Sequence, residues 1–287
     1  MSDLRLYTKG VQMDPILIVG SPRSGTTALS MGLGAAGISG YFEGHFLMLF
    51  TRIEETIAKY YEDEANNSVP GTLLHALTIG RVIEEYRQLA RRMMDEVHHG
   101  KRWFDKTAHG GMIGSLPFFK SIWPEAKIIF AKRRPIENLE SRLKKFNHMS
   151  FADHCKDLKY IFNAWAVIRT ELSPWIEIDQ YDLLHSPAQS TRLISDFLGL
   201  DEDAAAAFRA TIENAHPERT STSYDTRRFS DLNWSQGEKD LFVAELGGIM
   251  KLFNYGYDEY YVDGTSPAQR EVGGQSRSSV GQPTLSP

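Results

Sequence analysis

The feature that most constrains the fold is a glycine-bounded loop near the start of the chain. The apolar run PILIVG (15–20) is followed by SPRSGTT (21–27) and then by a helical pattern through Ala36. A buried strand, a tight loop and a helix are the expected elements. The spacing Gly20-x-x-x-x-Gly25-Thr26-Thr27 is that of a phosphate-binding loop in its usual context. Backbone N–H groups and the helix N-terminus would face one anion there.

Further strands and helices alternate along the chain. Strand patterns lie at 127–131 (KIIFA), around 103–105 and at 175–181 (WIEIDQY), and helical patterns lie at 73–97, 136–146, 152–172 and 236–253. This alternation predicts an α/β fold with a mostly parallel central sheet flanked by helices.

Length and composition favour one large domain. The 287 residues are 41% hydrophobic, enough for a substantial core over residues 1–262. Residues 263–287 are rich in Gly, Ser, Pro and Gln, so we expect a disordered C-terminal tail, because such a segment buries too little surface to offset its ordering entropy. The net charge of -5 argues against a nucleic-acid partner, although a local basic pocket is compatible with it.

The chain has the composition of a protein from a reducing compartment. Cys155 is the single cysteine, which excludes an intrachain disulfide and fits a buried thiol. The N-terminus has no apolar run of secretory type, and no stretch of about 18 apolar residues occurs. A cytoplasmic protein without stable membrane insertion is therefore expected.

The loop differs from that of nucleotide triphosphatases in the position of its cationic residue. Thr26 stands where those enzymes carry the lysine that clamps the β- and γ-phosphates, and Arg23 supplies a cation inside the loop instead. A phosphosulfate carries a single charge on the transferred group, and its departure leaves charge on a phosphate oxygen. An arginine beside helix N–H donors suits that leaving group without a metal.

The segment SPRSGTT resembles the 5'-phosphosulfate loop of sulfotransferases that use 3'-phosphoadenosine 5'-phosphosulfate (PAPS). The resemblance implies a P-loop-like sulfotransferase architecture and release of the product PAP. It also implies that Arg23 contacts the sulfonate and the leaving oxygen. The cofactor contacts expected from this loop are Arg23, Ser24, Gly25, Thr26 and Thr27.

A second match follows the strand at 127–131. The segment KRRPIENLES (132–141) resembles the family's 3'-phosphate motif, in which an arginine before a proline and a serine eight residues later hold the phosphate. Arg133 and Ser141 fit that spacing. A guanidinium can bind phosphate through two hydrogen bonds, and both anion motifs follow strand ends, where ligands of open parallel sheets bind. A solvated surface helix is the alternative interpretation.

A third match is YDLLHSP (181–187) with the helix RLISDFLG (192–199), which resembles a family segment whose tyrosine approaches the adenine. Tyr181 is an adenine-contact candidate, and a core tyrosine is equally compatible with the pattern. Ala28 stands where cytosolic members place a base-stacking tryptophan. The stretch 222–234 resembles the late loop over the cofactor, from which Arg227 or Arg228 could reach the 3'-phosphate, although the family's basic-glycine signature is absent.

Three side chains are candidates for the base that removes the acceptor proton. Glu43 is favoured, because it stands twenty residues after Arg23, as in several bacterial and Golgi-type sulfotransferases. His109 follows Lys106 and Thr107 as in the cytosolic Lys-Thr-His motif, but Ala108 is inserted before it. His45 is the third candidate. Lys106 is expected to contact the sulfonate oxygens.

The remaining expectations concern the acceptor and the alternatives. The acceptor is a hydroxyl or amine of a small molecule, a carbohydrate or a lipid, and the region 46–99 is expected to form part of a helical cap over the active site. No metal site is predicted, and a homo-oligomer stays open. A P-loop small-molecule kinase and a non-catalytic nucleotide-binding protein are the alternative functions.

Overall fold

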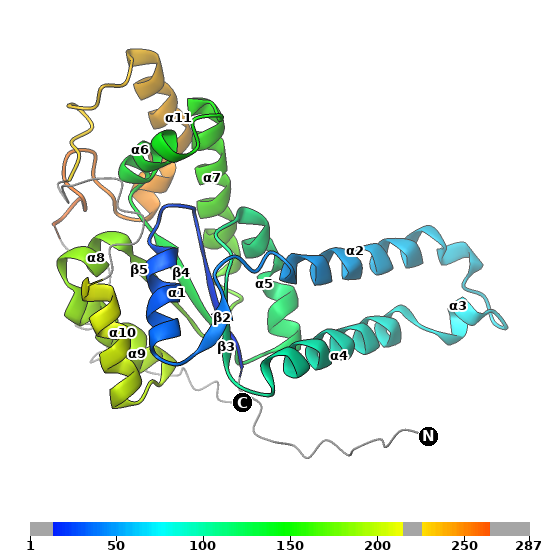
Figure 1. The fold of residues 1–287 in the computed structure, drawn as a ribbon. Coiled ribbons are helices and arrows are strands. Elements are labelled where there is room, and N and C mark those ends of the chain that lie inside the picture. The colour runs from blue at the N-terminus through cyan, green and yellow to red at the C-terminus, as the bar shows by residue number, and fades with distance from the viewer. Residues whose placement is uncertain (1–13, 215–225, 265–287) are drawn as a thin grey trace, which may run out of the picture.

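The structure is a computed structural model that describes residues 14–214 and 226–264 (Figure 1). Its centre is a five-stranded sheet in the order β2-β3-β1-β4-β5, and every pair of neighbouring strands is parallel. The strands are β1 (Ile16–Gly20), β2 (Ser39–Tyr41), β3 (Trp103–Lys106), β4 (Lys127–Lys132) and β5 (Trp175–Asp179). The expected α/β fold with a parallel sheet is confirmed.

Helices connect the strands and cover both faces of the sheet (Figure 1). They are α1 (Thr26–Ala35), α2 (Leu47–Asp63), the 3-10 turn η1 (Ala65–Asn67), α3 (Leu73–Ala76), α4 (Ile79–His98), α5 (Gly110–Ile122), α6 (Pro135–Lys145), α7 (Phe151–Ile168), α8 (Gln180–His185), α9 (Pro187–Leu198), α10 (Glu202–Asn214) and α11 (Gln236–Leu252).

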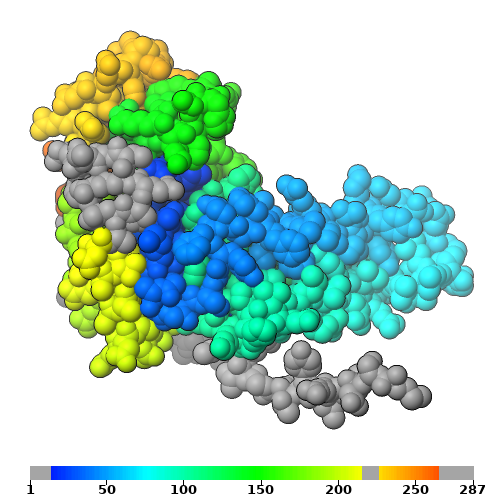
Figure 2. All heavy atoms as spheres, in the orientation of Figure 1, coloured from blue at the N-terminus to red at the C-terminus, as the bar shows by residue number. Residues whose placement is uncertain are grey.

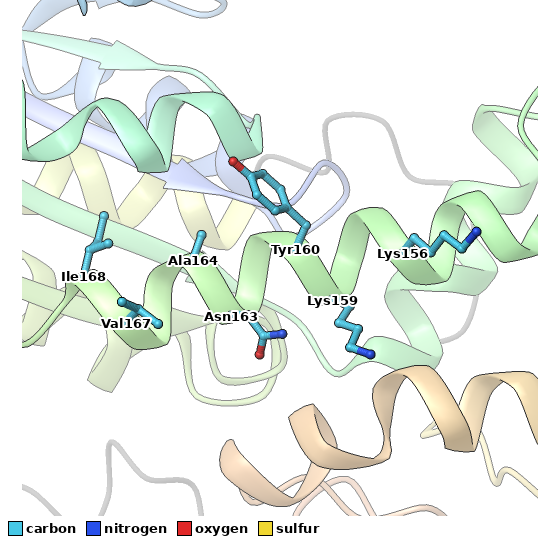
Figure 3. Close-up of a pocket in the computed structure, with 7 residues that line it drawn as sticks. All are labelled: Lys156, Lys159, Tyr160, Asn163, Ala164, Val167 and Ile168. Atoms are coloured by element: carbon cyan, nitrogen blue, oxygen red, sulfur yellow. The ribbon is translucent and has the colours of Figure 1, made fainter. Parts of the chain in front are cut away.

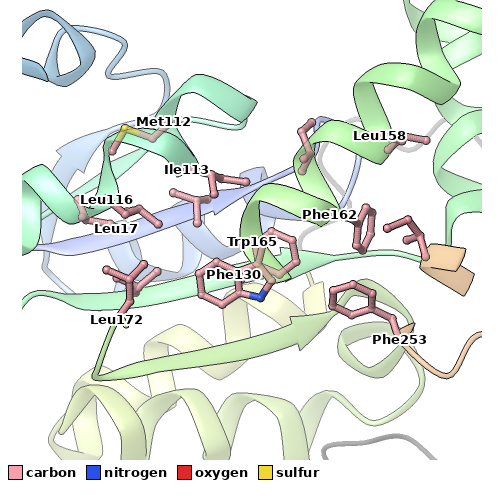
Figure 4. Close-up of a cluster of buried hydrophobic side chains, with 14 of the residues drawn as sticks. Leu17, Met112, Ile113, Leu116, Phe130, Leu158, Phe162, Trp165, Leu172 and Phe253 are labelled. Carbon is pink, nitrogen blue, oxygen red and sulfur yellow. The ribbon is translucent and has the colours of Figure 1, made fainter. Parts of the chain in front are cut away.

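The central strand β1 is buried on both faces, which explains its unbroken apolar run. Alternate side chains point to opposite faces. Leu17 and Val19 join a core with α5, α7 and α11, whereas Ile16 and Ile18 join a second core with α1, α9 and α10. In the first core the rings of Phe130 and Trp165 stack at 4.5 Å between centroids (Figure 4).

Two strands differ from expectation. The strand expected over 175–181 ends at Asp179, because the Asp179 side chain accepts the N–H of Tyr181 at 2.9 Å and caps α8. Strand β2 was not expected, since the three residues Ser39–Tyr41 at the sheet edge are exposed or only partly buried and carry no apolar pattern.

The region expected to form a cap is a helical hairpin of α2 and α4 that projects from the body (Figures 1 and 2). The single helix expected over 73–97 is broken at Leu77 and Thr78, where the backbone is not helical and the Leu77 carbonyl accepts the hydroxyl of Tyr61 from α2. Two hydrogen bonds from Arg87 to Glu54, at 2.6 and 2.7 Å, join the two long helices.

Parts of two expected segments lie outside the described residues. These parts are 265–287 of the predicted tail and 222–225 of the late loop. Within the described ranges, none of the helices combines the length and the apolar character needed to cross a bilayer.

Candidate active site

The loop between β1 and α1 is held in shape by two glycines and one serine. Gly20 has φ 144°, and a Cβ there would overlap the carbonyl oxygen of Ala131 on β4. Gly25 has φ 85° and begins α1 in the left-handed conformation. The Ser24 hydroxyl lies 2.6 Å from the carbonyl oxygen of Ser21 and 2.8 Å from that of Ala131. Ser24 therefore stabilises the loop, and its backbone N–H is the group available to an anion.

The N-terminus of α1 has the properties of an anion site. No side chain among the described residues caps this helix, and its first turn contains no acidic residue. The first N–H groups of a helix lack intrahelical partners and carry partial positive charge. Thr26 and Thr27 supply N–H groups of this kind at the mouth of the loop.

The two predicted anion motifs meet in space. Strands β1 and β4 pair with Gly20 opposite Ala131, so the loops that follow them are neighbours. Arg23 donates from Nε to the Ser141 hydroxyl at 3.0 Å, and Arg133 donates from Nη1 to the Arg23 carbonyl at 3.2 Å. Residues 118 and 110 apart in the sequence thus form one basic junction.

Glu43 and Lys106 form an ion pair at the other side of the loop. Lys106 is the last residue of β3 and its side chain is buried, whereas the Glu43 side chain is about half exposed. His45 lies with Nε2 at 3.4 Å from Glu43 Oε2 and is exposed. The structure therefore brings together Glu43, His45 and Lys106, and it leaves the Glu43 carboxylate accessible from solvent.

Asp105 lies beneath the segment that carries Glu43, and it was not among the predicted residues. Its Oδ1 accepts the Thr107 hydroxyl at 2.8 Å, and Thr107 Oγ1 accepts the N–H of His45 at 3.2 Å. A Cβ at Gly44 would overlap Asp105 Oδ2, so any larger residue at position 44 would displace this carboxylate. Burial raises the pKa of Asp105 to about 6. An acidic residue within a fully buried strand was the signal that could have identified it.

His109 has a structural role in the described residues. It begins α5 with an extended backbone, and its Nδ1 accepts the N–H of Gly111 at 2.9 Å. The inserted Ala108 precedes this capping position. Proton transfer by His109 would compete with the cap, because Nδ1 is already an acceptor.

Tyr181 is sandwiched between two other rings. It stacks on His185 at 3.9 Å and on Tyr260 at 4.0 Å between centroids, so both of its faces are covered. An adenine contact would therefore use the ring edge or the hydroxyl. The side chains of Arg227 and Arg228 are exposed, and the backbone of Arg227 is bound on both sides by Arg134 and Glu137.

Three buried residues that support the anion motifs were missed from the sequence. Asn138 donates to the Ser21 hydroxyl at 2.6 Å and so joins α6 to the phosphate loop. Arg134 is fully buried, in ion pair with Glu137, although it stands beside Arg133 in the sequence. Polar residues on the inner face of α6 were a usable signal for buried partners.

Elsewhere in the described residues, the candidate ligand sites are weaker than the basic junction. A shallow groove of about 500 Å³ lies on α7 (Figure 3), lined by Lys156, Lys159, Tyr160, Asn163, Ala164, Val167 and Ile168. None of the predicted site residues lines it, and its walls are mostly apolar, so the basic junction is the better candidate for an anionic ligand. The described residues contain no cluster of three or more His, Cys, Asp or Glu side chains suited to a metal ion.

Three solved sulfotransferase structures resemble this chain, and the one with a TM-score above 0.5 supports the fold. A sulfotransferase from Mycobacterium avium, STF9, is 11% identical and matches 87% of this chain and 79% of its own, with a TM-score of 0.54. The sulfotransferase domain of the Synechococcus PCC 7002 olefin synthase is 20% identical over 69% of this chain and 78% of its own, with a TM-score of 0.46. STF1 from Mycobacterium tuberculosis H37Rv is 16% identical over 81% of this chain and 77% of its own, with a TM-score of 0.45.

Comparison of the sequence with protein families identifies the chain. A search of curated protein sequences finds no significant match. The sulfotransferase family model matches residues 15–204, which include the phosphate loop, the Glu43–Lys106 pair and the Arg133 motif. The chain therefore belongs to the sulfotransferase family.

Proposed function

We propose that the protein transfers a sulfonate group from PAPS to a hydroxyl or amine of a small-molecule, carbohydrate or lipid acceptor. The observation that carries this proposal is the junction of Arg23, Ser141 and Arg133, where the two anion motifs are joined by hydrogen bonds. A ligand with two separate anionic ends fits two adjoining anion sites. The buried single cysteine, Cys155, is compatible with a cytoplasmic protein.

Different residues of the junction bind the two anionic ends of PAPS. The N–H groups of 24–27 and the Arg23 side chain hold the 5'-phosphosulfate end, since both supply positive charge at the loop. Arg133 and Ser141 hold the 3'-phosphate, with Arg227 and Arg228 as further exposed cations. Tyr181 approaches the adenine by its edge. When bound, PAPS supplies an electrophilic sulfur and a phosphate leaving group.

Glu43 is the proposed base. Its half-exposed carboxylate takes the proton of the acceptor hydroxyl or amine as the acceptor oxygen or nitrogen attacks in line. Lys106, buried beside it, stabilises negative charge on the sulfonate oxygens. His45 can polarise Glu43 from 3.4 Å, and His109 stays the alternative base.

Calorimetric titration of PAP in buffer with EDTA tests the cofactor and its 3'-phosphate site. Wild type should bind at micromolar concentration, and Arg133→Ala should weaken binding by about 10- to 100-fold, the range for a charge-assisted hydrogen bond. Arg192→Ala is the matched control, because the Arg192 side chain is 84% exposed on α9.

Absence of PAP binding by wild type would refute the proposal. Turnover of ATP that requires Mg²⁺ would then support a P-loop kinase. PAP binding by wild type without sulfonate transfer to any acceptor would instead support a non-catalytic nucleotide-binding protein.

A further inference from the structure

The segment after α11 is connected to the candidate nucleotide site by a buried chain of hydrogen bonds. Asp179, at the end of β5, accepts the hydroxyl of Tyr260 at 2.7 Å. The oxygen of the same hydroxyl accepts the backbone N–H of Arg134 at 3.0 Å. Asp179, Tyr260 and Arg134 are all buried, so water does not compete for these bonds.

The bond from Arg134 acts on Arg133. The N–H of Arg134 belongs to the peptide group that joins these two residues, so fixing it fixes the ψ angle of Arg133. Arg133 in turn donates to the carbonyl of Arg23 in the phosphate loop. The hydroxyl of Tyr260 thus sets the backbone from which the Arg133 guanidinium extends.

The Arg134 side chain also binds neighbouring segments to the start of α6. It donates to the carbonyls of Gly256 at 2.9 Å and Glu259 at 2.7 Å, and its guanidinium lies 5.1 Å from the Tyr260 ring centroid. It also contacts Glu137, which accepts the N–H of Arg227 at 3.1 Å. The segment 255–261 and the residue 227 are therefore held by the first turn of α6.

We propose that Tyr260 is a positioning residue for the 3'-phosphate, acting through the peptide group between Arg133 and Arg134. The inference rests on the proposed function, in which Arg133 holds that phosphate. Tyr260 lies beyond residues 15–204, the part of the chain that the family model matches. This part of the site is therefore built by a segment outside the family motifs.

Titration with two nucleotides separates positioning from general destabilisation. PAP carries the 3'-phosphate and adenosine 5'-monophosphate lacks it. Tyr260→Phe keeps the ring that stacks on Tyr181 and removes only the hydroxyl. We expect PAP binding to weaken by about 5- to 10-fold, the effect of losing the hydrogen bond from the Arg134 N–H, and binding of the monophosphate to change by less than about 2-fold.

Two further variants complete the experiment. Tyr261→Phe removes a neighbouring hydroxyl that contacts Asp182 at 3.3 Å and should leave the ratio of the two affinities unchanged. The double variant Arg133→Ala, Tyr260→Phe should bind PAP about as weakly as Arg133→Ala alone, since the hydroxyl acts through Arg133. Thermal unfolding of each variant confirms that folded proteins are compared.

The outcomes separate this inference from the proposed function. If wild type does not bind PAP, the proposed function fails. If wild type binds PAP and Tyr260→Phe binds both nucleotides like wild type, or loses both affinities equally, the positioning role is overturned and the proposed function stands.

Discussion

At the scale of single residues, the candidate base is the half-exposed carboxylate of Glu43, which is paired with the buried ammonium group of Lys106. Glu43→Gln keeps the size of the side chain but cannot accept a proton. We expect sulfonate transfer from radiolabelled PAPS to a panel of acceptors to fall by about 10²- to 10⁴-fold, with PAP affinity changed by less than about 2-fold. Glu55→Gln, on the exposed side of α2, is the matched control. An unchanged rate in Glu43→Gln would assign proton removal to His45 or His109.

Asp105 makes the stability of the protein depend on pH. Burial raises its pKa from the ordinary 3.8 to about 6, with His45, Glu43 and Lys106 nearby. Between these values the folded state keeps a proton that the unfolded state has released, so the free energy of unfolding falls as pH rises through this window. The fall is complete above the folded pKa and amounts to about 3 kcal/mol for two pKa units.

Asp105→Asn removes this titration. Denaturant unfolding of both proteins from pH 3 to pH 8 should show the wild type losing about 3 kcal/mol relative to the variant as pH rises. Asp179, whose pKa burial also raises to about 6, is present in both proteins and cancels in the difference. Parallel stability curves would mean that Asp105 is not the titrating group.

At the scale of elements, the close approach of β1 and β4 requires glycine at position 20. In Gly20→Ala the new Cβ would overlap the Ala131 carbonyl, and φ 144° is rarely adopted by alanine. We expect a loss of about 2 to 5 kcal/mol in the free energy of unfolding by urea denaturation. Gly114→Ala is the control: this glycine on α5 has no neighbour within 4 Å of a Cβ, so alanine should stabilise the helix by about 0.5 to 1 kcal/mol. Equal stability of wild type and Gly20→Ala would contradict the described contact.

Burial and packing explain which helices and strands can be predicted from the sequence. β1 and β4 are unbroken apolar runs because helices cover both of their faces. α5 was missed, since Gly110, Gly111 and Pro117 disfavour a helix in isolation. Its apolar side is buried against the sheet and α7, so packing rather than intrinsic propensity stabilises it.

At the scale of the whole molecule, the site divides into a local part and a long-range part. Arg23, Arg133 and Ser141 belong to short motifs at strand ends, and a parallel sheet brings strand ends together, so their proximity could be predicted. The bond between Arg134 and Tyr260 spans 126 residues and joins two segments that share no motif. A single sequence carries no signal for that pairing, because each residue by itself resembles an ordinary surface arginine or core tyrosine.

The pairing of Gly20 with Ala131 holds the loops after β1 and β4 at one distance from each other. Neighbouring strands lie about 4.8 Å apart, so the pairing of β1 with β4 fixes the distance between the starts of the two loops that follow them. A slip of β4 by one residue would send every side chain of that strand to the opposite face and would move Arg133 away from Arg23. If the two loops bind the two charged ends of one nucleotide, as proposed, the backbone pairing of β1 with β4 sets the distance between the two binding sites.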